Sequence, residues 1–385
     1  MQVSFSRDFS QWAQQDKFLE KLEVTRELAR KRYTSEHIKQ IRALGMPAKS
    51  LALLYGMMRE YCETGFACFS HIRFLCWFWE NGDKIVFPLN SNNQIYLGND
   101  SSSWLEYWPF LKKTSINSYR CDLPEFTEPQ PTDDEENYVL GLGGQSHFGH
   151  FVANRVAALH QSNLAYPYIS TLNTILVPIH YLELHKLILS AVLGGKPKKF
   201  HDLPCEAGIY TFKNTVIPCI DEHYNAITGL QGVIEKNSSN RLTKKDKRVY
   251  ITRAVQGVND RLIGFKKFAV MLESLDFEIL NPTNLTFSDR LNLIGDSEFI
   301  LTDSGSCSLN GLLFSNKCSS VRQMLTTRVI STIEESIINQ LCMGFNQGVQ
   351  GQWLIVDSAI LSTKNPWYDI CFPPSIHTIK KLLSL

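Results

Sequence analysis

Two histidines stand in a glycine-rich segment that could perform acid–base chemistry. Residues 141–150 read Gly-Leu-Gly-Gly-Gln-Ser-His-Phe-Gly-His, and residues 138–140 before them are typical of a strand. Histidine titrates near neutral pH and can accept a proton from a hydroxyl group, so His147 and His150 are candidate bases. A purely structural role for both is the alternative. A dinucleotide fingerprint would need glycine at position 146, where this chain has serine, so the segment indicates such a cofactor only weakly.

Two arginines are placed where they could bind a diphosphate. Arg253 directly follows residues 249–252, a predicted strand, and ligands of open α/β sheets bind at the carboxyl ends of strands. Its guanidinium group offers a fixed fork of donors that matches phosphate oxygens. Arg261, near the start of the next predicted helix, could contact the same anion. Both could equally be surface residues in solvent.

A third candidate is the serine-rich loop that follows the predicted strand 299–301. It contains Asp303, Ser304, Gly305 and Ser306, and it leads into a predicted helix over 309–314. Hydroxyl groups and the backbone amides at the start of a helix attract phosphate. Asp303 could act as a base, bind a ribose or cap the helix. A plain capped turn is the alternative for the whole loop.

Several familiar catalytic patterns are missing from the chain. It has no Gly-x-x-x-x-Gly-Lys-Ser/Thr phosphate loop, no Gly-x-Ser-x-Gly elbow and no His-Glu-x-x-His metal motif. It also lacks Asp-x-Asp, the acidic pair that often holds a metal–diphosphate complex. A bound diphosphate would therefore be neutralised by arginine and helix amides, and we expect no metal cofactor.

The elements that must position these residues divide the chain into three parts. Trp12, Phe18, Leu22 and Leu28 recur at helical spacing and predict a helical segment over residues 9–64. From residue 66 short aromatic and β-branched runs predict strands. From residue 248 strands and helices alternate regularly, which indicates a parallel sheet with right-handed crossovers.

A polar, basic stretch at 235–247 separates the two strand-containing parts. We therefore predict an N-terminal helical segment (1–65), a Rossmann-like domain (66–240) and a second Rossmann-like domain (241–385).

Composition limits the partners and the location. The 385 residues carry 39 Lys and Arg against 38 Asp and Glu, a net charge of +1, which removes the electrostatic argument for a nucleic-acid partner. None of the ten cysteines forms a Cys-x-x-Cys pair, and reduced core thiols are expected. The longest apolar run, 174–193, is interrupted by charged residues and histidines, so no transmembrane segment is predicted. These features favour a cytoplasmic protein.

Five segments in the second half resemble the family-61 glycosyltransferases, an inverting group that includes many bacterial capsule enzymes. The strand ending in Thr252-Arg253 matches the family's strand that ends in Ser/Thr-Arg, and residues 305–314 are similar to its Gly-Ala-Gly-Leu-Thr-Asn-Leu-Leu-Phe loop. His147-Phe-Gly-His150 stands where the family has Asn-Tyr-Gly-His. The remaining similar segments are 271–280, 285–294 and 296–302.

The resemblance implies a GT-B architecture, in which two Rossmann-like domains face each other across a cleft and the C-terminal one holds a nucleotide sugar. By this likeness Arg253 would pair with the donor phosphates. The other donor-binding positions would be Gly305, Ser306, Asn310 and, on the helix of the donor domain, Glu273. His150 would face the cleft from the acceptor side. The chain departs from the family at Ser304, where a histidine is common, and at Asn154, where the family has an acidic residue.

The sequence thus predicts an inverting, metal-independent glycosyltransferase that moves a sugar from a nucleotide sugar to a hydroxyl of a glycan or lipid-linked glycan, in surface polysaccharide synthesis. His150 is the first candidate base, with His147 and Asp303 as alternatives. The rival hypotheses are a nucleotide-dependent oxidoreductase or epimerase and a non-catalytic glycan-binding or scaffold subunit. Residues 1–65 could pack on the core, mediate dimerisation, or dock on a membrane-associated assembly at the inner face of the membrane.

Overall fold

The described residues form two compact units, which we call unit 1 and unit 2. Residues 1–28 and 61–219 belong to unit 1, and residues from 247 onward belong to unit 2. The computed structural model describes residues 1–28, 52, 61–78, 84–97, 108–116, 118–129, 138–140, 151–172, 174–177, 183–194, 199–202, 204, 206–219, 247–254, 262–303, 305–315, 319–326, 350–356, 358–359 and 370–384. The predicted boundary at 240/241 falls outside these ranges and stays a prediction.

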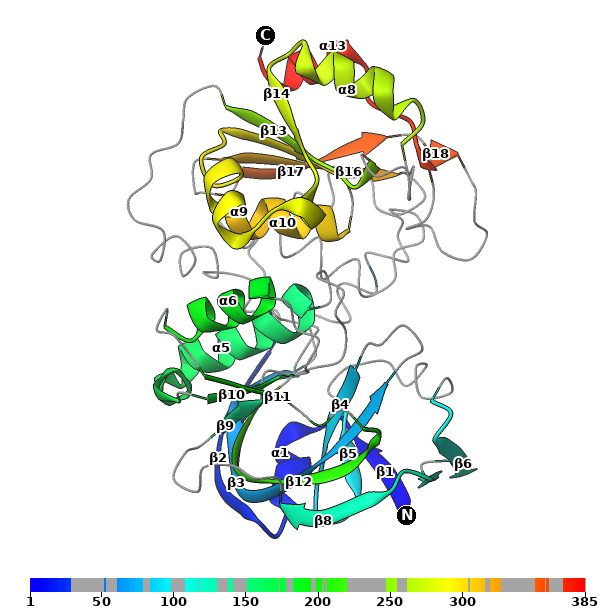
Figure 1. Ribbon diagram of the computed structural model, residues 1–385, viewed down its shortest axis with the longest axis vertical. Coiled ribbons are helices and arrows are strands. Elements are labelled where there is room, and N and C mark those ends of the chain that lie inside the picture. The colour runs from blue at the N-terminus through cyan, green and yellow to red at the C-terminus, as the bar shows by residue number, and fades with distance from the viewer. Residues whose placement is uncertain are drawn as a thin grey trace. The chain divides into compact units, whose positions relative to one another are not determined.

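Unit 1 is built on one 12-stranded, strongly curved sheet (Figure 1). Its strand order is β11-β10-β9-β12-β3-β4-β5-β1-β7-β6, with β2 paired to β3 and β8 to β12. The strands are β1 (Gln2–Ser6), β2 (Leu19–Leu28), β3 (Tyr61–Phe78), β4 (Lys84–Leu89), β5 (Gln94–Tyr96), β6 (Leu111–Ser115), β7 (Ser118–Cys121), β8 (Glu125–Pro129), β9 (Tyr138–Leu140), β10 (Thr174–Val177), β11 (Lys199–Asp202) and β12 (Gly208–Pro218).

Only one end of this sheet has parallel βαβ connections. Strands β9, β10 and β11 are parallel neighbours, and α5 (Ala157–Ala165) and α6 (Glu183–Val192) lie in the connections between them. A π-helix, η3 (Phe151–Val156), precedes α5, and a 3₁₀ helix, η4 (Pro167–Thr171), follows it. The rest is mainly antiparallel, with the long strands β3 and β12 paired from Gly208↔Cys76 to Pro218↔Phe66. Unit 1 is therefore a mixed sheet that contains one βαβαβ portion.

The predicted helical segment over residues 9–64 is wrong for much of its described part. A short helix, α1 (Phe9–Gln14), is present, but Leu19–Leu28 form strand β2, which pairs antiparallel with β3 from Leu19↔Phe69 to Leu28↔Tyr61. The register shifts between Leu19 and Lys21, and Leu19, Leu22 and Val24 all pack on the core. A shifted strand brings residues three apart to one face, which imitates helical spacing.

Unit 2 contains a five-stranded, wholly parallel sheet in the order β14-β13-β15-β16-β17. This is one of the strand orders of doubly wound α/β sheets. The chain adds β14 on one side of β13 and then β15, β16 and β17 on the other side, so the strand order reverses between β13 and β15. The strands are β13 (Arg248–Ile251), β14 (Phe277–Leu280), β15 (Phe299–Thr302), β16 (Ser320–Thr326) and β17 (Gln350–Val356); β18 (Ser358–Ala359) and β19 (Ile370–Cys371) form a separate antiparallel pair.

Helices cover both faces of this sheet (Figure 1). On one face, α8 (Phe265–Glu273) and α13 (Ile376–Leu382) place Phe268, Leu272 and Ile379 in a core with Tyr250 and Leu301. On the other face, α10 (Ser306–Phe314) packs on β15 and contacts α9 (Phe287–Leu293); a 3₁₀ helix, η7 (Pro282–Asn284), precedes α9. The prediction of an α/β protein is confirmed by the two sheets and their helices, whereas the division into two Rossmann-like domains stays a prediction. No helix among the described residues is long and apolar enough to cross a membrane.

Candidate functional site

The candidate site lies at the carboxyl edge of the unit 2 sheet, where the strand order reverses. Strand β13 ends at Ile251 and is followed by Thr252 and Arg253, and the neighbouring strand β15 ends at Thr302 and is followed by Asp303. Ligands of open parallel sheets bind at such a reversal, because the connections leave the two strands toward opposite faces. The structure therefore brings two predicted site residues, Arg253 and Asp303, to one edge.

Asp303 is tied to strand β13 through both oxygens of its carboxylate. Its Oδ1 accepts a hydrogen bond of 2.5 Å from the Tyr250 hydroxyl, and its Oδ2 accepts one of 2.6 Å from Thr252 Oγ1. Thr252 Oγ1 in turn accepts from the backbone N–H of Ala254 at 3.0 Å. These bonds fix the backbone on either side of Arg253. The geometry favours an anchoring role for Asp303 over the role of a base.

The Tyr250 hydroxyl is a permanent donor in this arrangement. Tyr250 is fully buried, and burial raises its pKa well above the ordinary value for tyrosine; the nearby negative charge of Asp303 raises it further. Both effects disfavour the phenolate, because a second negative charge would stand in an apolar core beside a carboxylate. Tyr250 therefore stays protonated, and its hydroxyl donates a hydrogen bond to Asp303.

Helix α10 begins directly after this anchor. Gly305 precedes its first turn with φ 78° and ψ −137°, a conformation that side-chain-bearing residues rarely adopt. The first residue, Ser306, is buried, and Ser308 Oγ donates to the Gly305 carbonyl at 2.6 Å. The first amides of a helix lack partners within the helix and carry its positive dipole end. Gly305 and Ser306 therefore lie where an anion could be bound.

Asn310 lies in the second turn of α10 and bonds within the protein through both atoms of its side-chain amide. Its Oδ1 accepts from a guanidinium N–H of Arg290, and its Nδ2 donates to the Ser306 carbonyl at 2.8 Å. The side chain is buried and holds the second turn of α10 to the first. The structure thus gives Asn310 the role of shaping the loop from within, whereas direct contact with a donor stays a prediction.

Arg290 is a component of the site that the sequence reasoning missed. It is buried on α9 and donates to the carbonyls of Pro282 and Leu285, the latter at 3.2 Å, as well as to Asn310. Burial lowers its pKa to about 10. Arg290 therefore joins the loop after β14 to helix α10. The only sign of Arg290 in the sequence is its position next to a helix-capping pair. Thr286 and Asp289 cap α9, and Arg290 follows Asp289 directly.

Glu273 lies at the opposite edge of the sheet. It is the exposed last residue of α8, four residues before β14 begins, whereas Arg253 follows the end of the parallel neighbour β13. The structure does not bring Glu273 together with Arg253 and Asp303. The other predicted site residues, His147, His150, Arg261 and Ser304, lie outside the described residues. Within the described part of the chain, no group of three or more His, Cys, Asp or Glu residues could hold a metal ion.

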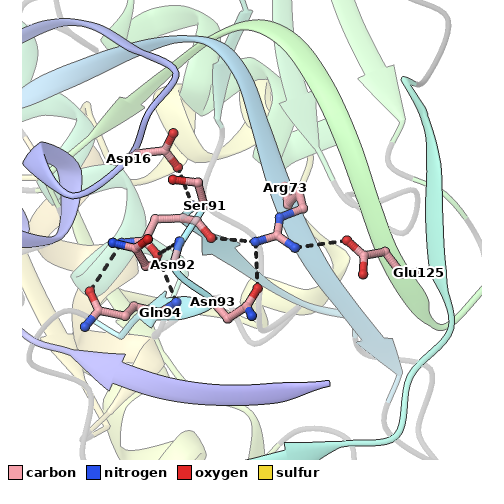
Figure 2. Close-up of polar contacts among 8 residues, drawn as sticks. Asp16, Arg73, Ser91, Asn92, Asn93, Gln94 and Glu125 are labelled. Atoms are coloured by element: carbon pink, nitrogen blue, oxygen red, sulfur yellow. Dashed lines mark hydrogen bonds and ion pairs between the residues drawn. The ribbon is translucent and has the colours of Figure 1, made fainter.

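Unit 1 contains a cluster of hydrogen-bonded polar side chains around Arg73 (Figure 2). Arg73 donates to Glu125 at 2.9 Å, to the Asn90 carbonyl at 2.7 Å and to Asn93 Oδ1 at 2.8 Å. Asp16 accepts from the backbone N–H of Ser91 at 2.7 Å. These side chains bind one another and the backbone of the β4–β5 turn, so the cluster holds distant segments together and leaves the unit 2 edge as the better candidate.

No family model matches this chain, and no curated protein does. The candidate site therefore rests on the geometry at the carboxyl edge of unit 2.

Proposed function

We propose that the protein is an inverting, metal-independent glycosyltransferase that moves a sugar from a nucleotide sugar to a hydroxyl of a glycan acceptor. The observation that carries the proposal is the position of Arg253 and of the α10 N-terminus, which follow the two strands between which a doubly wound sheet reverses. The segments that resemble family-61 glycosyltransferases coincide with the elements that build this edge, from β13 to α10.

In this proposal the diphosphate of the donor lies against Arg253 and the first amides of α10. Negative charge develops on the diphosphate as the bond to the sugar breaks, and donors already oriented toward it lower the barrier. Inversion needs a single displacement, in which a base takes the acceptor proton on the face opposite the leaving group. His150 is the proposed base, with His147 as the alternative.

The GT-B architecture belongs to the same proposal. Unit 2 would be the nucleotide-sugar domain, and the βαβαβ portion of unit 1 would serve the acceptor. His147 and His150 stand in the sequence between β9 and η3, the position where parallel sheets present ligand-binding loops. The acceptor would be a glycan or lipid-linked glycan of a surface polysaccharide.

A thermal-shift comparison of nucleoside diphosphates, nucleotide sugars and NAD tests the proposal. A ligand that binds only the native state stabilises it by about 2.7 kcal/mol at about a hundredfold excess over its Kd. We expect one nucleoside diphosphate, and the nucleotide sugar that contains it, to raise the unfolding midpoint. For each ligand the rise should be the same with and without a metal chelator. Stabilisation by NAD alone would instead support the oxidoreductase or epimerase hypothesis, and glycan binding without a nucleotide effect would support the non-catalytic one.

Arg253→Ala gives the sharper test. Removing one group that stabilises developing charge costs about a hundredfold or more in turnover. We expect Arg253→Ala to lose this factor, together with the ligand-induced shift, while its own unfolding midpoint stays that of the wild type. Arg7→Ala, an exposed arginine of unit 1, is the matched control and should behave as wild type. Full activity in Arg253→Ala would overturn the assignment of the site.

A further inference from the structure

Exposed apolar side chains in the described part of unit 2 are concentrated on two helices and the short segments that precede them. The large ones are Ile263 at 40%, Val270 at 65%, Phe372 at 44% and Ile376 at 44% of full exposure. Val270 lies on α8 and Ile376 on α13, and the other two lie within four residues before these helices. Single exposed apolar residues are ordinary, but such a concentration indicates a surface that contacts something other than water.

Helices α8 and α13 form one layer. Phe268 and Leu272 from α8 share a buried cluster with Ile379 from α13. The segments leading into the helices are joined by a 2.9 Å hydrogen bond from the Ile263 N–H to the Cys371 carbonyl. Both helices lie on the same face of the sheet (Figure 1). Their outward sides therefore make one continuous surface, which we call the α8/α13 surface.

Exposed lysines lie on the same two helices as exposed apolar side chains of the α8/α13 surface. They are Lys266 and Lys267 on α8 and Lys380 and Lys381 on α13. None of the four forms an ion pair with another described residue. The exposed acidic residues of these described segments are Glu273, the last residue of α8, and Asp276, three residues after it. The surface thus combines apolar groups with excess positive charge.

We propose that the α8/α13 surface docks on an anionic lipid bilayer. Among the described residues of this surface the exposed cations are lysines, whose ammonium groups are point charges on flexible stems and suit a fluid layer of phosphates. Exposed apolar groups between them can enter the boundary between headgroups and acyl chains, as in helices that lie in a membrane interface. An acidic protein partner is better matched by arginine, which forms fixed bidentate pairs with carboxylates. This proposal stands independently of the glycosyltransferase function.

Sedimentation of the full chain with vesicles tests the proposal. We expect binding to phosphatidylcholine vesicles that contain about a third phosphatidylserine, and little binding to pure phosphatidylcholine. Each lysine near an anionic surface contributes about fivefold to the partition coefficient. A variant with Lys266, Lys267, Lys380 and Lys381 all replaced by Gln should therefore bind at least about a hundredfold more weakly.

A charge-matched control separates this surface from general electrostatic attraction. The control variant replaces four lysines of unit 1 by Gln, each of them exposed: Lys17, Lys21, Lys112 and Lys113. It removes the same charge and should leave most of the binding intact. Val270→Ser with Phe372→Ser should lower binding about tenfold at an unchanged unfolding midpoint. Equal losses in the two lysine variants, equal binding to neutral vesicles, or binding to polyglutamate but not to vesicles would overturn the proposal.

Discussion

Tyr250 and Asp303 connect the stability of unit 2 to the geometry of the candidate site. The phenol donates to the carboxylate at 2.5 Å inside the core. Tyr250→Phe removes this bond to a charged group, and we expect a loss of about 1.5–3 kcal/mol in the free energy of unfolding at neutral pH. Urea unfolding measures it directly.

The stability deficit of Tyr250→Phe should also depend on pH, and it should decrease as the pH rises above about 10. An unfolded tyrosine ionises near pH 10, whereas the raised pKa of Tyr250 keeps it protonated in the native state. Above about pH 10 the native state therefore binds more protons than the unfolded state, and the wild type loses stability as the pH rises. Tyr250→Phe lacks this loss, so its deficit should shrink. Thr252→Val, which removes the other hydroxyl but no titrating group, should keep a constant deficit; constant deficits in both variants would contradict the role of Tyr250.

Arg290 holds three segments together, and its removal should be costly. Arg290→Met leaves the carbonyls of Pro282 and Leu285 and the side-chain oxygen of Asn310 without their donor, away from water. We expect a loss of about 3 kcal/mol in the free energy of unfolding, because unsatisfied buried acceptors retain their desolvation cost. Arg290→Lys keeps the charge without the fork and should lose an intermediate amount. A Met variant as stable as the wild type would show that the three bonds contribute nothing.

At the scale of the secondary-structure elements, α10 packs against β15 through a glycine, Gly311. A Cβ atom built on Gly311 would lie 2.9 Å from Thr302 Cγ2 and 3.3 Å from Ile300 Cγ2, both on β15. Gly-to-Ala changes normally favour a helix. Here we expect Gly311→Ala to destabilise unit 2 by about 1–3 kcal/mol, because the helix must move away from the sheet.

The double variant identifies the cause of this destabilisation. Thr302→Ser deletes the methyl group that the new Cβ would meet, so Gly311→Ala/Thr302→Ser should lose less than the sum of the two single changes. Chemical unfolding of the four proteins measures the coupling. If the losses of the two single variants add, the contact between the new Cβ atom and the Thr302 methyl group is not the cause of the destabilisation.

The elements that sequence patterns predicted best are those of unit 2. The strands 249–252 and 299–301 and the alternation of strands and helices from residue 248 are present nearly as expected, because parallel βα units have short connections and near-continuous apolar strands. The position of Arg253 and Asp303 at one edge followed from that regularity. The bonds of Asp303 to Tyr250 and Thr252 did not, since they join residues about fifty positions apart.

Unit 1 was harder to predict, because its sheet is assembled from distant segments. Strand β2 carries a register shift that imitates helical spacing, and its partner β3 lies about forty residues further along the chain. Strand β8 lies in a proline-rich, acidic stretch that indicates a loop, yet residues 125–129 pair with β12. Local propensity is a weak guide where pairing with a distant strand decides the conformation.

The molecule as a whole contains separate hydrophobic cores for its two units. One core of unit 1 is built around Trp12, and the core of unit 2 is built around Tyr250; the two clusters have no residue in common. Trp12 is fully buried, contacts the rings of Phe69 and Tyr96, and donates from its indole N–H to the Gln94 carbonyl at 2.8 Å. It therefore joins α1 to strands that are far away in the sequence.

Trp12→Ala tests whether the two units, which have separate cores, also unfold separately. Truncating a large buried aromatic residue costs about 3–5 kcal/mol, through lost burial and the cavity left behind. We expect amide hydrogen exchange to accelerate strongly in β3, β4 and β12, while the protection of β13, β15 and α10 stays close to that of the wild type. Trp12→Phe, which keeps a ring but loses the hydrogen bond, should show the same pattern at smaller amplitude. Equal acceleration in both sheets would mean that the two cores unfold as one cooperative unit, and the carboxyl edge of the unit 2 sheet would then depend on the N-terminal residues for its stability.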